Sequence, residues 1–387
     1  MPPRLPRNHL VSEALERVQG LVALVERDGA CALPGVGINY NVLVPLIKRA
    51  MARGFVKKQT GDFVLRGLWF GFDLGIDLDA VKGRRWFNNY PSAWANREAV
   101  TEAQRKRVAA QKTIALFPIQ SRSTSALPWT SCRVFPLGAV PKPLEPGTVR
   151  PVSDHTRSGL KAATDLEQFK HTLNTYNEIA SFLKPGYFMR MSDVDGAFPL
   201  LPLAPRLWPF FLCHWYSTEV GDADRLWLYM HLCCDFGAAG VPGTWKLFFA
   251  DTIVGVARSE GYLTLPLPIY VDDLALIGPV QLSVDAEGER LGKWLAEMGV
   301  PTKALKDRKA STLQLALGFV WDSVKRTRTL EEKKLAAYLS NLLSFAKRKS
   351  LSLREMQQIG GRLQRAVMTL PRGLCVSWLL SSRSCGG

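Results

Sequence analysis

An apolar segment, residues 269–278, is interrupted in its middle by two adjacent aspartates, Asp272 and Asp273. The residues around them are typical of β-strands, and a carboxylate without a partner is strongly unfavourable inside a buried strand. A β-hairpin with both acids at its turn removes this conflict, and a divalent cation bound there would neutralise them. The segment therefore predicts a hairpin with a metal site, and an exposed Asp-Asp turn is the alternative.

A second strand-like segment, residues 187–192, is followed directly by Asp193. Because Asp193 and Asp272 lie far apart in the chain, only the fold can bring their carboxylates together. Carboxylates at neighbouring strand ends suit a two-metal site for phosphoryl transfer. Between these segments, residues 236–243 are rich in Gly and Ala, and small residues let a nucleobase or a backbone approach a helix start closely. A flexible loop before a core helix is the alternative there.

The strand-like segment that ends at Asp193, the Gly-rich segment at residues 236–243 and the Tyr-Val-Asp-Asp hairpin follow one another in this order. Together they resemble palm motifs A, B and C of reverse transcriptases. The resemblance implies that Asp193, Asp272 and Asp273 are catalytic and bind two Mg²⁺ ions, with Mn²⁺ as an alternative ion. The implied reaction is template-directed transfer of a deoxynucleotidyl group to a primer 3′-hydroxyl. Its partners are an RNA or DNA template-primer and deoxynucleoside triphosphates.

The same resemblance gives roles to residues near the acids. Phe198 lies five residues past Asp193, where the family has an aromatic steric gate against the ribose 2′-hydroxyl. Phe236 and Gly237 match family residues near the incoming nucleotide and the template base. Asp235 stands where many relatives have Pro, so this loop departs from the family pattern.

Flanking segments extend the resemblance in both directions. Lys306 matches the motif D lysine that protonates the leaving pyrophosphate, which makes it a catalytic candidate. Gly318 and Phe319 resemble part of the strand pair that grips the primer. Upstream, Lys142 and Arg150 on the arms of an expected hairpin would hold the triphosphate, a role suited to fixed cations. A pair of solvated charges on a turn is the alternative.

The resemblance covers residues 128–373 and implies an α+β, right-hand polymerase fold with a mainly helical N-terminal extension. Residues 63–75 and 351–363 are most similar to DIRS-type retrotransposon polymerases, with Gypsy-type elements next. The expected regions are 1–125 for the extension, 126–186 for the fingers, 187–323 for the palm with an inserted fingers segment, and 324–387 for a helical thumb and the start of the connection.

The charge of the chain agrees with a nucleic-acid partner. Its 387 residues include 50 Lys and Arg against 34 Asp and Glu, a formal net charge of +16, which favours polyanions. Residues 324–373 hold a large share of the basic surplus, so the expected thumb is also the expected grip on template and primer. No uninterrupted helical run of 18 apolar residues is present, so no membrane partner is expected. Nothing in the sequence specifies an oligomeric state.

Two other functions are open at this point. An RNA-dependent RNA polymerase is disfavoured by Phe198 and by Tyr-Val-Asp-Asp in place of Gly-Asp-Asp. A catalytically silent, domesticated nucleic-acid-binding protein is disfavoured by the three aspartates. Irregularly spaced cysteines and the lack of an apolar signal core predict an intracellular protein of the cytoplasm or nucleus, not a secreted one. The abrupt C-terminus predicts a fragment of a longer polyprotein or a truncated gene.

Local patterns give the expected secondary structure. Two capping-box signatures, Thr329 with Glu332 and Ser352 with Glu355, predict helix starts in the basic segment. The cysteines near His231 are expected to be buried thiols, with a zinc cluster as the alternative. Residues 63–76 are apolar but interrupted by Gly, so their state is ambiguous. Apolar periodicity predicts helices at residues 12–27, 45–53, 96–116, 166–183, 241–257 and 285–298.

Overall fold

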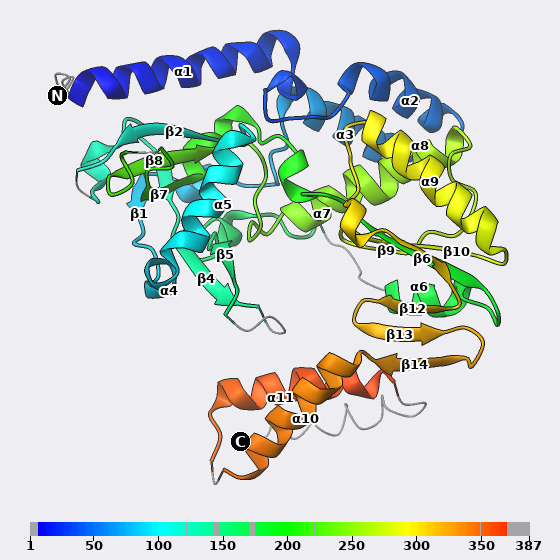
Figure 1. Cartoon of the computed structure of the whole chain (residues 1–387). Helices are drawn as coiled ribbons and strands as arrows, with labels where there is room; N and C mark the ends of the chain where they lie inside the picture. Colours follow the sequence, from blue (N-terminus) through cyan, green and yellow to red (C-terminus); the bar gives the residue numbers. More distant parts are fainter. Residues whose placement is uncertain are drawn as a thin grey trace. The chain divides into compact units, whose positions relative to one another are not determined.

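A computed structural model describes residues 7–120, 122–142, 147–169, 175–219, 221–348 and 350–369. The chain divides into two compact units, each assembled from several segments (Figure 1). Unit 1 contains residues 1–173, 193–264 and 289–304, and unit 2 contains residues 174–192, 265–288 and 305–387. None of the helices in the described ranges is both long and apolar enough to cross a lipid bilayer.

Unit 1 is built on a mixed five-stranded sheet with the order β1-β3-β7-β8-β2. Its edge strand β1 pairs in parallel with β3, whereas β7, β8 and β2 form antiparallel pairs. A separate antiparallel hairpin, β4–β5, leaves this sheet. The strands are β1 (Arg84–Trp86), β2 (Thr113–Pro118), β3 (Cys132–Val134), β4 (Leu137–Pro141), β5 (Val149–Ser153), β7 (Leu212–Tyr216) and β8 (Leu226–His231).

Helices cover this sheet and extend beyond it. Figure 1 shows α1 and α5 against β2, and α4 against β4. A second group, α2, α3 and α8, packs together. The helices are α1 (Arg7–Asp28), α2 (Tyr40–Ala52), α3 (Lys58–Phe70), α4 (Pro91–Ala95), α5 (Arg97–Ala109), α7 (Val241–Trp245) and α8 (Val254–Ser259), with short turns η1 (Ala30–Ala32), η2 (Asp79–Val81), η3 (Thr124–Ala126), η4 (Lys161–Ala163), η5 (Phe198–Leu200) and η6 (Pro205–Phe210).

One helical stretch of unit 1 is wound unusually. Between α7 and α8, the segment η7 (Lys246–Ile253) is a π-helix. The hydroxyl of Thr252 donates to the carbonyl of Leu247, five residues back, at 2.8 Å. Lys246 and Asp251 form an ion pair at the same spacing. The expected helix at 241–257 is therefore present, but its middle turns are wider than the α-helical period assumes.

Unit 2 is built on two sheets, one of four strands in the order β11-β6-β10-β9 and one of three in the order β12-β13-β14. Their shared core includes Met189, Ile277, Phe319 and Trp321. Helix α9 (Gln281–Glu297) begins in this unit and continues into unit 1. The remaining elements are α6 (Thr175–Phe182), β6 (Phe188–Asp193), β9 (Ile269–Tyr270), β10 (Asp273–Gly278), η8 (Ala304–Lys306), β11 (Arg308–Ser311), β12 (Leu313–Ala316), β13 (Phe319–Asp322), β14 (Thr327–Leu330), α10 (Glu332–Ala346) and α11 (Leu353–Val367).

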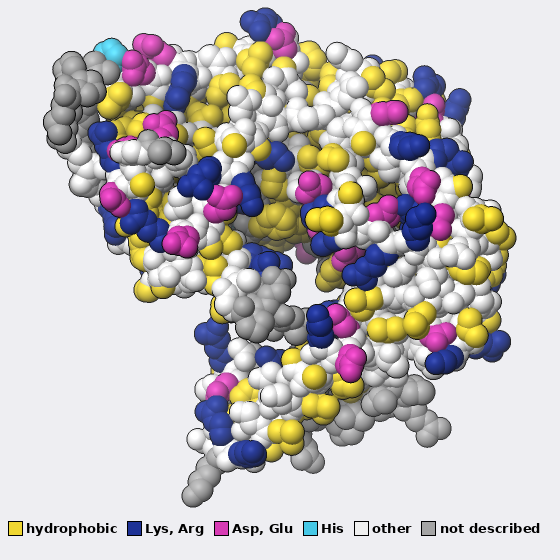
Figure 2. Space-filling view, in the orientation of Figure 1, with side chains coloured by type: hydrophobic (Ala, Val, Ile, Leu, Met, Phe, Trp, Pro, Cys, Tyr) yellow, Lys and Arg dark blue, Asp and Glu magenta, His cyan; other side chains and the backbone are white. Residues whose placement is uncertain are grey.

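The two C-terminal helices keep apolar side chains open to solvent. Leu339 and Leu343 of α10 are 51% and 64% exposed, and Met356 of α11 is 56% exposed. Figure 2 shows hydrophobic side chains on the surface of these helices, with Lys and Arg around them. Part of the apolar surface of both helices is thus open to solvent.

Several local expectations are wrong. The expected helix at 96–116 ends with α5, and residues 113–118 form β2 because they pair with β8. Of the helix expected at 166–183, residues 166–169 form a turn and α6 is helical, whereas residues 170–174 lie outside the described ranges. Thr329 is no helix cap, because it pairs with Val320 in the β13–β14 ladder. The ambiguous stretch at 63–76 is largely helix α3.

Candidate functional site

The segment with two aspartates forms a tight hairpin, β9–β10. Asp273 pairs with Tyr270, so Val271 and Asp272 are the two turn residues. Asp272 therefore lies at the turn, and Asp273 is the first residue of β10. Val271 has a φ of 58°, a left-handed conformation that is strained for a β-branched residue. Such strain persists only where the surrounding structure enforces it, and it concentrates at functional sites.

Asp193 is buried at the end of β6, with 2% of its surface exposed. The ammonium of Lys303 forms an ion pair with its carboxylate. The backbone N–H of Lys303 also donates to the Asp193 carbonyl at 2.8 Å, because residues 301–303 run beside residues 193–195. No local pattern indicated Lys303, since its partner is 110 residues away. Lys306, the expected motif D residue, is exposed in η8 of unit 2.

Phe198 lies in an aromatic cluster of unit 1. Its ring is buried, with its centroid 4.8 Å from that of Phe236 and 6.4 Å from that of Trp245. Phe236 itself is 50% exposed, so it forms the solvent side of the cluster. The two phenylalanines that the sequence singles out, 38 residues apart, are thus brought into direct contact.

Gly237 is required by the backbone of this loop. Its φ is 101°, which L side chains rarely adopt. A Cβ at this position would lie 2.2 Å from the carbonyl oxygen of Ser153, at the end of β5. The loop before α7 therefore lies directly against the hairpin β4–β5.

Asp235, the departure from the family pattern, is a buried anchor of the same loop. It is 1% exposed and forms an ion pair with Arg107 of α5. The imidazoles of His231 and His155 lie 3.3 and 3.8 Å from its other oxygen. Its Oδ1 also accepts a 2.8 Å hydrogen bond from the N–H of Phe236. A carboxylate at position 235 thus fixes the start of the loop that carries Phe236 and Gly237.

The electrostatics of this anchor follow from its burial and its partners. Burial alone would raise the pKa of Asp235, but the charge of Arg107 and the neighbouring imidazoles outweigh it and hold the pKa well below its usual range. Burial lowers the pKa of His231, although Asp235 opposes the shift. Burial also raises the pKa of the nearby thiols of Cys213 and Cys233 to about 12. These cysteines are therefore protonated, buried groups at neutral pH, as the buried-thiol interpretation expects.

Lys142 and Arg150 lie on opposite arms of the β4–β5 hairpin. Val140 pairs with Arg150, and the Lys142 N–H donates to the carbonyl of Thr148 at 3.0 Å. Lys142 and Thr148 are therefore opposite each other, and Arg150 is two residues farther along the same arm. Side chains at these positions share one face of the hairpin. The tip, residues 143–146, lies outside the described ranges.

Gly318 and Phe319 lie at the turn into β13. Gly318 has a φ of 77°, and a Cβ there would lie 2.0 Å from Nζ of Lys334. The Phe319 ring is fully buried, with the guanidinium groups of Arg328 and Arg365 over it at 5.5 and 5.6 Å. Any contact of this turn with a ligand therefore comes from Gly318 and the backbone, while the Phe319 side chain belongs to the core of unit 2.

No protein-family model matches the chain. The Gag-Pol polyprotein of baboon endogenous virus (strain M7) is 26% identical to it over 267 residues, which are 63% of this chain and 15% of the polyprotein. The structure of a foamy viral protease-reverse transcriptase (dRH) in complex with double-stranded DNA matches with a TM-score of 0.55 and 17% identity, over 78% of this chain and 45% of that chain. A second foamy viral protease-reverse transcriptase structure with double-stranded DNA gives a TM-score of 0.49 and 16% identity, over 74% and 50% of the two chains.

The fold resembles that of a reverse transcriptase. The expected α+β polymerase fold is thereby confirmed. The chain spans half or less of the length of each of these relatives. The likeness to a retroviral polyprotein agrees with a retroelement origin, and the DIRS or Gypsy subtype stays a prediction.

The metal expectation rests on three aspartates. Asp193, Asp272 and Asp273 supply carboxylates, which are the ligands that Mg²⁺ prefers. The strands that carry Asp193 and Asp273, β6 and β10, are neighbours in one sheet. In the described part of the chain, no group of three or more His, Cys, Asp or Glu side chains is arranged as a metal site. Lys303 supplies a positive charge to Asp193.

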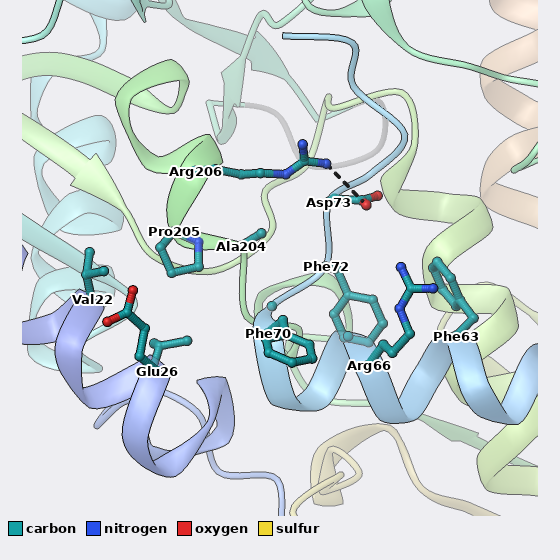
Figure 3. Close-up of a pocket in the computed structure, with 13 residues that line it drawn as sticks. Val22, Glu26, Phe63, Arg66, Phe70, Phe72, Asp73, Ala204, Pro205 and Arg206 are labelled. Carbon is teal, nitrogen blue, oxygen red and sulfur yellow. Dashed lines mark ion pairs between the residues drawn. The ribbon is translucent and has the colours of Figure 1, made fainter.

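One cavity of unit 1 lies apart from these residues. It has a volume of about 620 Å³ and lies between α1, α3 and the segment before η6 (Figure 3). Phe63, Phe70 and Phe72 form one wall, and an ion pair between Arg206 and Asp73 spans 3.3 Å at its rim. None of the residues expected to act in catalysis or nucleotide binding lines it.

Proposed function

We propose that the chain is an RNA-directed DNA polymerase of a retroelement. In this proposal it transfers a deoxynucleotidyl group to a primer 3′-hydroxyl under the direction of a template. The observation that carries the proposal is the strained two-residue hairpin that presents Asp272 at its turn and Asp273 at the start of β10, within a fold like that of a reverse transcriptase. The similarity to a Gag-Pol polyprotein supports the retroelement source, and a DIRS-type or Gypsy-type element is the expected class.

Asp193, Asp272 and Asp273 would hold the two Mg²⁺ ions, for which Mn²⁺ is an alternative. When bound, these ions lower the pKa of the primer hydroxyl and stabilise the leaving oxygens. The burial of Asp193 favours this role, because a buried carboxylate needs a positive partner. Lys303 provides that charge for the protein alone and would have to share Asp193 with an incoming cation.

Phe198 would act as the gate that excludes the 2′-hydroxyl of ribonucleotides. This role requires that the Phe198 ring be held in a fixed position, since the ring must not move away when a substrate binds. The ring is backed by Phe236 and Trp245, and the loop of Phe236 is anchored by Asp235 and by the close approach of Gly237 to Ser153. Phe236 and Gly237 would line the pocket of the incoming nucleotide.

Lysine and arginine side chains outside the metal site would bind phosphate groups. Lys142 and Arg150 share one face of the β4–β5 hairpin, which suits two groups that hold one triphosphate. Lys306 would serve as the acid for the leaving pyrophosphate.

Gly318, at a turn whose backbone admits no side chain, would approach the primer most closely, with Phe319 beneath it. The basic helices α10 and α11 would follow the template-primer backbone.

Primer extension on poly(rA)/oligo(dT) with dTTP and Mg²⁺ tests the proposal. The wild-type chain is expected to incorporate nucleotide, and Asp272→Asn to lose incorporation to background. Asp224→Asn is the matched control, because Asp224 is a carboxylate with a 92% exposed side chain in unit 1. Equal incorporation by wild type and Asp272→Asn, or none by the wild type with either metal, would refute the enzyme.

Two outcomes of the same assay would indicate the alternatives. A wild type that binds template-primer but incorporates nothing would be a domesticated nucleic-acid-binding protein. Preferential incorporation of UTP would indicate an RNA-dependent RNA polymerase. The gate is tested with Phe198→Ala, for which a lower dTTP-to-UTP preference is expected, and an unchanged preference removes that assignment.

A further inference from the structure

A strongly basic pocket lies beside β1, at the edge of the five-stranded sheet. It is shallow, with a volume of about 460 Å³, and no acidic side chain lines it. Its lining residues are Arg84, Arg85, Trp86, Phe87, Arg122, Ser123 and Thr124. Arg133 of β3 pairs with Arg85 in the parallel β1–β3 ladder, but it is buried and does not line the pocket. We call Arg84, Arg85, Arg122 and Arg133 the arginine cluster.

Three members of the arginine cluster are held by neutral groups. Arg84 donates to the carbonyl of Trp129 at 2.6 Å, and Arg133 donates to the carbonyls of Gly83 and Lys82 at 2.5 and 3.2 Å. Arg122 lies over the ring of Trp94 at 4.8 Å. Within the described ranges, none of the four guanidinium groups forms an ion pair with a carboxylate. The charges are thus positioned by the fold but not compensated by it.

Like charges without a counter-charge repel one another, and the pKa values of nearby groups are shifted accordingly. Burial and the charge of Arg85 lower the pKa of Arg133. Burial and the charge of Arg122 lower the pKa of His214, packed on Trp86, to about 3. An anion in the pocket would relieve this repulsion, and guanidinium groups match phosphate oxygens bidentately.

The aromatic residues indicate which phosphate carrier fits. Trp86 and Phe87 line the pocket beside the guanidinium groups, and both are only partly buried. Aromatic faces next to arginines are the combination that binds single-stranded nucleic acid, since unstacked bases pack on the rings while phosphates contact the cations. In a duplex the bases are already stacked, and only the phosphates are available.

We propose that the exposed members of the arginine cluster, Arg84, Arg85 and Arg122, bind the phosphodiester backbone of a single-stranded nucleic acid, while Trp86 and Phe87 contact its bases. The site adds a second contact with a nucleic-acid strand to the proposed function, on the β1 edge of unit 1. It requires no catalysis, so it can be tested apart from polymerase activity.

The test measures the fluorescence anisotropy of labelled oligo(dT) with the full chain and with Arg85→Ala/Arg122→Ala. The double variant is expected to bind about tenfold more weakly. The slope of log affinity against log salt should fall by about 1.4, because two phosphate contacts on a single strand are lost. Affinity for a labelled duplex is expected to change less than about threefold. Arg225→Ala is the matched control, because Arg225 is exposed in the same unit and has no ion-pair partner within the described ranges.

Five results would overturn the inference. The first four are an unchanged affinity and salt slope in the double variant, an equal loss in Arg225→Ala, an equal loss for the duplex, and a wild type that binds phosphatidylserine vesicles but not oligo(dT). The fifth is competition by inorganic phosphate at the concentration of the oligonucleotide phosphates, since it would indicate a simple anion site. Thermal unfolding of each variant confirms that binding is lost without unfolding. Asp272→Asn should bind oligo(dT) as the wild type does, so failure of the polymerase proposal and failure of this one give different patterns.

Discussion

Arg107 and Arg85 lie in the same compact unit, but their surroundings differ. Arg107 reaches a buried carboxylate, Asp235, which two imidazoles also approach. Arg85 is exposed and lies with Arg84 and Arg122 at a pocket that no carboxylate lines. The two regions share a sheet, since β1 and β8 are both strands of it.

The contrast separates two uses of the same side chain. A guanidinium that is paired inside the protein fixes the backbone around it, as Arg107 does for the loop of Phe236. A guanidinium held by carbonyls and rings keeps its charge available for a ligand. Replacing a paired guanidinium should lower the stability of the fold, whereas replacing an unpaired one should weaken ligand binding. Mutations at the two kinds of site test this distinction.

The largest effect is expected from Arg107→Met, which leaves the Asp235 carboxylate buried without its charge partner. Breaking a buried pair in this way costs about 3–5 kcal/mol of unfolding free energy. Urea denaturation measures it, with Arg105→Met on the exposed side of α5 as the control, expected to change stability by less than about 0.5 kcal/mol. A loss below about 1 kcal/mol for Arg107→Met would contradict the structural role.

Arg190 extends the comparison to unit 2. It is 5% exposed and is paired with Asp285 and Asp307. Arg190→Met should cost about 2–3 kcal/mol, less than Arg107→Met, because both carboxylates left behind are more exposed than Asp235. The same denaturation series checks the order, and a larger loss than that of Arg107→Met would reverse it.

His214, near the arginine cluster, should make the stability of the fold depend on pH. The folded pKa of His214 is about 3, well below the unfolded value of about 6.5, so the unfolded chain takes up a proton that the folded chain excludes. This group's contribution is therefore fully present above pH 6.5 and is lost as pH falls toward 3. Between pH 7 and pH 5 the loss is about 2 kcal/mol. Replacing His214 with Phe should remove that part of the pH dependence, measured as the difference between the two denaturation profiles.

The smallest effect is expected from Arg85→Ala. Since Arg85 has no carboxylate partner within the described ranges and repels Arg133, its loss should leave stability within about 0.5 kcal/mol or raise it slightly. Thermal unfolding in parallel with Arg107→Met checks this. A loss of 2 kcal/mol or more would mean that the arginine cluster is structural after all.

Local patterns predicted those parts of the fold that local contacts determine. The capping box of Ser352 and Glu355 is present at the start of α11, because both of its partners lie within one turn. The same pattern at Thr329 and Glu332 failed, because pairing of β14 with β13 is a contact between strands that the pattern does not contain. For the same reason residues 113–118 became a strand despite a helical spacing upstream.

The candidate site also contains one feature that a local pattern predicts and several that only the fold determines. The hairpin of Asp272 and Asp273 follows from the conflict between two carboxylates and an apolar strand, which the sequence displays directly. Lys303 beside Asp193, Arg107 beside Asp235 and the arginine cluster join residues from separate segments. Each depends on strand register and chain path, so no spacing rule could have indicated it.

The π-helix η7 has a consequence for how this chain is aligned with relatives. A π-wound stretch carries one residue more than an α-helix needs to connect the same two ends, so it marks the place where a single insertion is accommodated inside a helix. Removing that residue would let the stretch wind as a regular α-helix between the same two ends, so α7 and α8 would keep their relative orientation. A relative with a regular helix here should therefore align only with a one-residue gap within residues 246–253. An alignment without that gap would assign the residues of the loop before α7 to the wrong positions.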